Sequence, residues 1–220
     1  MVNMLPGAVL LSFLASAAVW QKTPSAGEVA AALQRKYDTI HDFSADFTHR
    51  HQSGVLRRTR VEQGSLLVKK PGRMRWEYKS PEQKLFVSDG ARIYFHDVAN
   101  KQVTVSEVPV GEQAASAALF LAGNGNLERD FSASFMEGGG PDSYALRLEP
   151  KSSEAEYDWL EIVVGRDTLR IQSITAAQQD GGRDTFEFSN LKENVGLADK
   201  TFEFKIPPGV EVINTARAKL

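Results

Sequence analysis

Hydrophobic and polar positions divide the chain into one helical segment followed by a long series of strands. Four apolar residues recur at helical spacing and predict an amphipathic helix over residues 26–40, with one stripe that must pack on another element. Ser25 and Glu28 have the spacing of a capping box, in which each side chain bonds to the backbone N–H of the other residue. The stripe consists of Val29, Leu33, Tyr37 and Ile40.

After Asp42 the period changes to two, so apolar and polar residues alternate as they do on strands with one buried face. Turn signals such as Lys70-Pro71-Gly72 and Asp180-Gly181-Gly182 separate these runs. The pattern predicts a mainly β (α+β) chain with about ten or eleven antiparallel strands in a barrel or strongly curled sheet. The last run to be assigned to a strand consists of Phe202, Phe204 and Ile206.

An Ala-rich segment interrupts the strand series. Residues Val110 to Ala122 favour a helix, and Gly123 is a natural C-terminal cap. A sheet with one apolar face and two amphipathic helices can bury its apolar surfaces by packing the helices against that face. We therefore expect the sheet to curl and the helices to cover its concave side.

The N-terminus carries an apolar run of 11 residues, Ala8 to Ala18, which has the length of a signal-peptide core. Ala15-Ser16-Ala17 has the small-residue pattern of a cleavage site, although no Lys or Arg precedes the run. A buried N-terminal helix is the alternative. We predict an export signal over residues 1–17 and a single domain over residues 24–214.

Composition removes several classes of function. The 220 residues include 26 Lys and Arg and 28 Asp and Glu, so the net charge of −2 argues against nucleic-acid binding through bulk charge. The chain has no cysteine. Cysteine nucleophiles, Cys-based zinc sites, disulfides, iron–sulfur clusters and lipid attachment through an N-terminal cysteine are therefore excluded.

Candidate catalytic or metal-binding chemistry is sparse. His49 and His51 share one face of a strand, and His96 is a third histidine that we expect to be able to approach them. We interpret the pair as rim histidines rather than a metal site, because no further ligands follow at suitable spacing. Asp180 and Asp184 bracket a turn, where Asp is expected for backbone reasons. No nucleophile elbow, zinc-protease or P-loop motif occurs, and we expect no cofactor and no metal.

The densest basic cluster is Arg57-Arg58-Thr59-Arg60. It is typical of a solvated strand edge or loop. Its functional interpretation is a docking site for an acidic partner or for lipid headgroups.

Strand parity brings many apolar side chains together on the concave face. The pattern alone favours an ordinary core, but a curled sheet closed by two short helices also suits an apolar ligand in an unfilled cavity. These side chains are Phe47, Met74, Trp76, Phe86, Phe95, Phe135, Leu146, Leu148, Ile162, Ile174, Phe186 and Phe188.

Five segments in this order and spacing resemble the periplasmic lipoprotein carrier family, LolA. They are Leu33–Thr48, Val68–Tyr78, Leu85–Phe95, Leu119–Phe131 and Asp199–Val212. The resemblance implies an open antiparallel β half-barrel with helices that form a lid over a hydrophobic cavity. It also implies a periplasmic, non-enzymatic monomer without a cofactor.

The resemblance implies a carrier that accepts acylated lipoproteins from an inner-membrane, ATP-driven releasing complex. The carrier shields their acyl chains and delivers them to an outer-membrane acceptor. A periplasmic lipid or glycolipid shuttle on the same scaffold is the alternative. An exported hydrolase would need a catalytic constellation that the sequence does not offer.

The resemblance also assigns residues. Leu66, Ile93, Leu119 and Phe120 join the expected acyl-chain lining. Lys70 stands before Pro71, where the family commonly has an arginine that bonds to lid backbone carbonyls. Lysine has three donors on a flexible stem instead of a planar fork. We expect Lys70 to act as the lid latch nevertheless.

Overall fold

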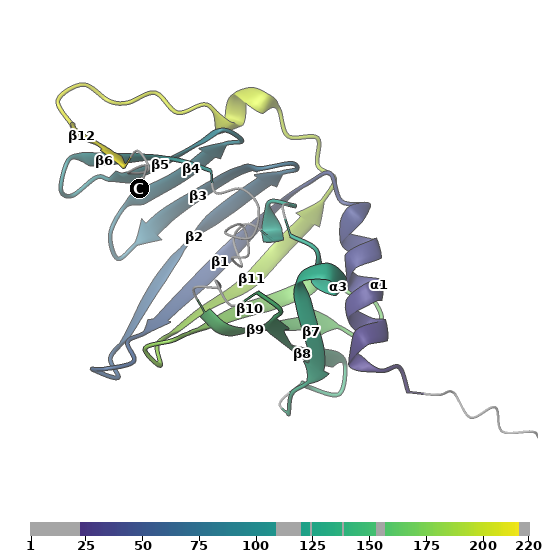
Figure 1. Cartoon of the computed structure of the whole chain (residues 1–220). Helices are drawn as coiled ribbons and strands as arrows, with labels where there is room; N and C mark the ends of the chain where they lie inside the picture. The colour runs from purple at the N-terminus through teal and green to yellow at the C-terminus, as the bar shows by residue number, and fades with distance from the viewer. Residues whose placement is uncertain (1–22, 109–119, 124, 138, 153–156, 216–220) are drawn as a thin grey trace, which may run out of the picture.

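The described part of the chain forms one open, curved sheet with helices on one of its faces (Figure 1). The computed structural model describes residues 23–108, 120–123, 125–137, 139–152 and 157–215. The predicted export signal and residues 110–119 of the second predicted helix lie outside the described residues. Within the described part, no helix is long and apolar enough to cross a membrane.

Helix α1 spans Ala26–Asp38 and confirms the helix predicted from the apolar stripe. Its N-terminus is closed by the predicted capping box. The Glu28 backbone N–H donates to Ser25 Oγ at 3.2 Å, and the Ser25 N–H donates to Glu28 Oε2 at 2.7 Å. The apolar stripe of α1 is buried against the sheet, so burial of one face adds to the intrinsic helix propensity.

The 12 strands lie in the order β12-β6-β5-β4-β3-β2-β1-β11-β10-β9-β8-β7, and all neighbours are antiparallel except β12 and β6. The mainly β, open and curled sheet is therefore confirmed, with more strands than expected. The strands are β1 (Asp42–Gln52), β2 (Thr59–Lys69), β3 (Arg73–Ser80), β4 (Lys84–Asp89), β5 (Arg92–Asp97), β6 (Gln102–Glu107), β7 (Phe131–Phe135), β8 (Ser143–Pro150), β9 (Tyr157–Gly165), β10 (Ile171–Gln178), β11 (Arg183–Glu193) and β12 (Glu211–Thr215). A short helix, α3 (Leu127–Asp130), and a 3-10 turn, η2 (Asp199–Phe202), complete the elements used below.

The strand predicted over Phe202, Phe204 and Ile206 is wrong. Phe202 ends the 3-10 turn η2, and the chain then crosses the outer face of the sheet, where the Phe204 ring lies 5.2 Å from that of Tyr94. The outer face of this half of the sheet carries fully buried apolar residues such as Val87, which need a cover. The two phenylalanines supply that cover. The last strand follows further on and pairs in parallel with the edge strand β6.

Candidate functional site

The pairing register gathers the predicted lining residues into rows on the face that α1 covers. Residues directly opposite one another on neighbouring strands point to the same side of a sheet. Every strand residue that the sequence assigned to the lining falls on this one face. One row is Leu66, Trp76, Phe86 and Phe95, and another is Phe135, Leu146, Ile162, Ile174 and Phe186.

Burial differs among these residues. Phe86, Phe186 and Phe188 are partly buried and pack against the core, and Ile93 is also partly buried. Phe95 and Phe135 are 36% and 45% exposed. Leu119 lies outside the described residues. The fully buried members are Phe47, Leu66, Met74, Trp76, Phe120, Leu146, Leu148, Ile162 and Ile174.

Aromatic rings fill the centre of this face. The Phe47 ring lies 5.1 Å from that of Trp76, 4.9 Å from that of Tyr78 and 6.2 Å from that of Phe186, all edge to face. Gly64 lies directly opposite Phe47 on β2, and a Cβ there would come within 2.7 Å of the Phe47 ring. The face therefore forms a packed apolar core.

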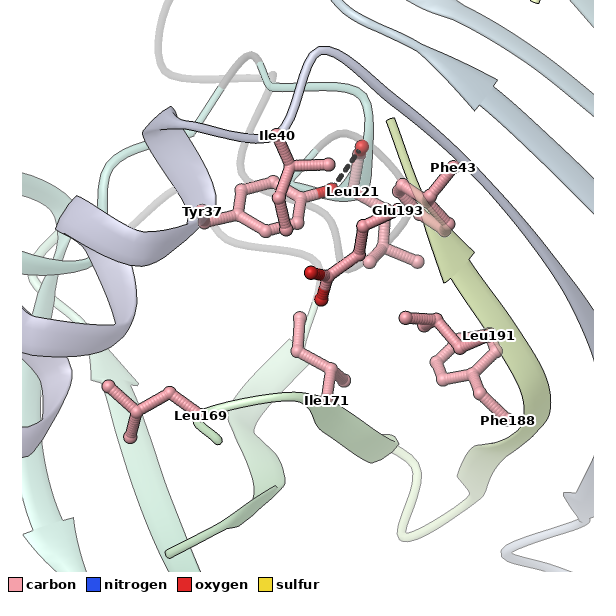
Figure 2. A pocket seen from close by; sticks show the side chains of 9 residues that line it. All are labelled: Tyr37, Ile40, Phe43, Leu121, Leu169, Ile171, Phe188, Leu191 and Glu193. Atoms are coloured by element: carbon pink, nitrogen blue, oxygen red, sulfur yellow. Dashed lines mark hydrogen bonds between the residues drawn. The ribbon is translucent and has the colours of Figure 1, made fainter. Parts of the chain in front are cut away.

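A small apolar pocket remains between the end of α1 and strands β10 and β11 (Figure 2). Its cavity volume is about 20 Å³. Ligand pockets commonly have about 300–1,000 Å³, so this one has room for about one water-sized group and is too small for an acyl chain. It is lined by Tyr37, Ile40, Phe43, Leu121, Leu169, Ile171, Phe188, Leu191 and Glu193.

The charged end of Glu193 is neutralised where it meets the pocket. Its Oε2 lies 2.6 Å from Lys36 Nζ, and the Glu193 side chain is mostly buried. Lys36 belongs to α1 and Glu193 ends β11, so the ion pair ties the helix to the sheet beside the apolar pocket.

The cover of this face consists of α1, residues 120–123 and α3, and three further polar contacts hold it in place. The Tyr37 hydroxyl donates to the Leu121 carbonyl at 2.6 Å, and burial raises the pKa of Tyr37 well above its ordinary value. The Gly72 N–H donates to the Ala122 carbonyl at 2.9 Å. The Leu127 N–H of α3 donates to Gln34 Oε1 of α1 at 2.8 Å. These bonds join α1 to residues 120–123 and to α3, and they join residues 120–123 to the β2–β3 turn.

Lys70 lies at the same junction. Its Nζ donates to the Tyr37 carbonyl near the C-terminus of α1 and stands 4.3 Å from the centre of the Tyr37 ring. Burial lowers the pKa of Lys70, and the charge of Asp38 opposes that shift. Gly123 has φ +79°, and a Cβ there would lie 2.5 Å from Lys70 Cδ. Lys70 thus contacts both α1 and the segment at Gly123, and its role as a latch stays a prediction.

A polar network bounds the opposite end of the face. His49 Nε2 lies 3.0 Å and His51 Nδ1 2.7 Å from Asp184 Oδ1. Next to them the buried carboxylate of Glu62 accepts from Lys84 Nζ at 2.8 Å. Asp184 and Glu62 each have a hydrogen-bond partner, which is the condition for burying carboxylates beside an apolar surface. Nδ1 of His49 lies 3.5 Å from Glu62 Oε2 and is buried without a hydrogen-bond partner among the described residues.

The structure corrects the expected approach of His96 to the two other histidines. His96 lies on the outer face of β5, with its ring 6.0 Å from that of Phe204. Among the described residues no cluster of three or more His, Cys, Asp or Glu is arranged to hold a metal ion. Asp180 Oδ1 accepts from the Gly182 N–H at 2.8 Å, as expected for a turn residue.

Sequence reasoning missed part of the site. Phe43 has the same strand parity as Phe47, so the period of two carried a signal that would have found it. Ile40 belonged to the predicted apolar stripe, but the stripe does not show which strands it meets. Leu191 gave no signal, because its place depends on how the end of α1 meets β11. The hydroxyl of Tyr37 was also missed, since its partner is a backbone carbonyl far along the chain.

Comparisons with known proteins agree over most of the chain. Residues 38–205 match the family model described as "Outer membrane lipoprotein carrier protein LolA". Two relatives carry the name outer-membrane lipoprotein carrier protein. The one from Methylococcus capsulatus is 30% identical over 82% of this chain and 85% of its own length. The one from Legionella pneumophila strain Corby is 31% identical over 84% of this chain and 89% of its own length.

A solved structure shows the same fold without close sequence similarity. It is an uncharacterized conserved protein from Thermus thermophilus, with a TM-score of 0.52 and 12% identity. The match covers 84% of this chain and 96% of the other. At this level of identity the comparison supports the architecture alone.

Proposed function

The chain belongs to the LolA family of outer membrane lipoprotein carrier proteins, and we propose that it carries acylated lipoproteins through the periplasm. The observation that carries this proposal is the apolar inner face of the curved sheet, with aromatic rings at its centre and a helical cover. In this proposal the acyl chains bind against that face, and the protein part of the cargo stays outside.

The energetics of an acyl chain set what such a carrier needs. Each buried methylene contributes about 0.8 kcal/mol, so one chain of ordinary length contributes on the order of 10 kcal/mol. The inner face offers a continuous apolar surface from Phe43 on β1 to Leu148 on β8, and its paired charges lie at the margins. The lining residues named from the sequence are the proposed contacts.

Release requires a cover that closes again. The covered face is packed in the structure, so acyl chains enter only when the cover moves away from the sheet. A ligand shifts such an equilibrium by its differential affinity for the open state. The closing contacts of Tyr37 and Lys70 set the free energy that the cargo must overcome, and they favour release when the cargo has another apolar site to enter.

The wider assignments belong to the same proposal and are supported by the N-terminal apolar run, the charge balance and the family resemblance. The chain is exported by residues 1–17, takes cargo from the inner-membrane ATP-driven complex and passes it to an outer-membrane acceptor. It performs no chemical reaction, needs no cofactor, binds no nucleic acid and acts as a monomer.

The test is recovery of cargo from the periplasm. The tagged full chain is expressed in a Gram-negative host and purified from the periplasmic fraction, and bound material is identified by mass spectrometry. We expect an acylated lipoprotein in one-to-one ratio. Phe186→Glu introduces a charge into the centre of the lining and should abolish co-purification.

Two control variants keep the result interpretable. Phe135→Glu changes an exposed margin of the same face, so it should fold and reduce cargo only partly. Tyr94→Glu changes a half-buried aromatic residue on the outer face. If circular dichroism shows that this variant is folded, it should still bind cargo. Bound glycolipid or phospholipid instead of lipoprotein would identify the alternative shuttle. A folded protein without any apolar ligand would contradict both functions.

A further inference from the structure

The tip of the β1–β2 hairpin exposes two aliphatic side chains. Val55 is 82% and Leu56 is 67% exposed, the highest values among the large hydrophobic residues that the structure describes. Single exposed apolar residues are common on protein surfaces, but two adjacent ones at the end of a long hairpin form a small projecting apolar patch. In Figure 1 this tip lies at the lower left, at the end of the sheet away from α1.

The tip has a defined backbone. The Ser53 N–H donates to the Arg58 carbonyl at 3.1 Å, the Arg57 N–H donates to the Ser53 carbonyl at 3.0 Å, and the Leu56 N–H donates to Ser53 Oγ at 3.3 Å. These bonds close the turn and hold Val55 and Leu56 at its outer end.

A second hairpin supports the tip from the side. Gly54 lies against the turn between β10 and β11, and a Cβ at Gly54 would overlap the Asp180 carbonyl and lie 2.7 Å from the Gly182 nitrogen. Only glycine permits this close approach. The tips of the two hairpins lie side by side in Figure 1, so the aliphatic pair is presented by a braced structure.

Two arginines follow the aliphatic pair directly along the chain. Arg57 and Arg58 are exposed, and neither takes part in an ion pair between described residues. Arg60 differs, because its Nη2 lies 2.9 Å from Glu62 Oε1 and 2.7 Å from Glu82 Oε2. Two unpaired guanidinium groups therefore stand next to Val55 and Leu56.

We propose that this tip is a contact site for a lipid bilayer with anionic headgroups. Val55 and Leu56 enter the headgroup region, and Arg57 and Arg58 bind phosphate oxygens there. Arginine forms paired hydrogen bonds with phosphate, and its stem packs along apolar groups while its charge stays at the surface. Two projecting aliphatic side chains are enough to insert into a bilayer surface, whereas binding to a protein groove would need a larger and complementary apolar surface.

The site lies at the opposite end of the sheet from the cover of the apolar face. Contact at the hairpin tip therefore leaves α1 and the closing contacts of Tyr37 free to move. Two aliphatic residues and two arginines give weak, salt-sensitive binding. Such binding suits a protein that visits a membrane and leaves it.

The absence of cysteine makes a site-specific test direct. Leu56→Cys carries an environment-sensitive fluorophore, and the labelled protein is mixed with vesicles of phosphatidylcholine with or without phosphatidylglycerol. We expect a blue shift and stronger emission only with the anionic vesicles. Val98→Cys, at a 41% exposed aliphatic position in the β5–β6 turn, carries the same label and should not respond.

Flotation of the unlabelled protein with the same vesicles tests the side chains. Val55→Ser with Leu56→Ser should remove binding, and replacing Arg57 and Arg58 by Gln should weaken it about fivefold per arginine. Val98→Ser and Arg92→Gln are the matched controls, because neither Val98 nor Arg92 belongs to the tip.

Several results would overturn the proposal. They are a silent label at Leu56, equal binding to neutral and anionic vesicles, and unchanged flotation of both tip variants with unchanged unfolding midpoints. The vesicles contain no lipoprotein, so the outcome does not depend on the proposed carrier function. Loss of cargo with intact vesicle binding would refute the carrier function alone.

Discussion

Replacing Tyr37 by Phe removes one oxygen atom from the junction between α1 and the segment that contains Leu121. The Tyr37 hydroxyl is buried and donates to the Leu121 carbonyl at 2.6 Å. The ring also stacks on Phe120 with a centroid distance of 4.9 Å. Phenylalanine keeps that stacking and the filled volume, so the substitution isolates the hydrogen bond.

The expected magnitude follows from burial. A lost hydrogen bond that leaves a buried carbonyl without its partner costs about 1–3 kcal/mol. For a domain of this size, 2 kcal/mol lowers the midpoint of thermal unfolding by about 4–8 °C. The same loss weakens the closed state of the cover, since 1.4 kcal/mol corresponds to about tenfold in an equilibrium constant. The variant should therefore bind cargo more readily and release it more slowly.

Thermal unfolding followed by circular dichroism measures the first effect, and transfer of a purified lipoprotein to acceptor membranes measures the second. Tyr94→Phe is the matched control, because its hydroxyl lies 3.4 Å from Asp89 Oδ2 on the outer face. We expect the control to unfold close to the wild type. If Tyr37→Phe also unfolds within about 1 °C of the wild type, the hydrogen bond does not hold the cover and the reasoning fails.

Three further predictions rest on other contacts. Lys70→Met keeps the aliphatic stem but removes the N–H group that donates to the Tyr37 carbonyl of α1. We expect the free energy of unfolding measured in urea to fall by about 1 kcal/mol and lipoprotein release to become slower. Unchanged release would reject the latch. Gly64→Ala puts a Cβ 2.0 Å from the Glu77 carbonyl oxygen of β3 and 2.7 Å from the Phe47 ring, so it should lower the unfolding free energy by about 1–3 kcal/mol. Gly140→Ala, whose Cβ meets no atom within 4 Å, should leave the unfolding free energy unchanged. Burial raises the pKa of Asp184, but the two histidines bound to it outweigh that effect and hold its pKa below the ordinary value of 3.8. Because a depressed carboxyl pKa stabilises the fold above that value and loses the effect as pH falls below it, the acid loss of stability between about pH 5 and pH 2 should be smaller in Asp184→Asn than in the wild type.

The alternation of apolar and polar residues was enough to predict the sheet, because burial on one face forces a period of two. The capping box likewise predicted where α1 begins, since both partners lie within one turn of the chain. The same rule failed at Phe202 and Phe204, which alternate like a strand. Whether two apolar residues pair in a ladder or cover another face depends on what lies beneath them, and that was set by Val87 and its neighbours far away in sequence.

The candidate site divides in the same way. Parity identified the lining rows because each residue needed only its own strand. The bond from Lys70 to Tyr37 spans 33 residues and uses a backbone carbonyl, so the residues themselves carry no trace of it, and only the family resemblance pointed to Lys70. The network around Asp184 joins the β1–β2 hairpin to β11, and the pairing of β1 with β11 cannot be read from the order of the strands along the chain.

The packed inner face links stability to transport. Phe47, Trp76 and Phe186 stabilise the empty protein by packing on one another, and the proposed acyl chains use the same surfaces. The net affinity for cargo is therefore the gain from burying acyl methylenes minus the contacts that opening removes. A lining of similar size with stronger internal packing would release cargo faster but load it less readily. Substitutions that disturb ring packing alone, such as Phe47→Leu, should consequently change the unfolding free energy and the cargo equilibrium together. A change in one without the other would show that the lining and the core are separate.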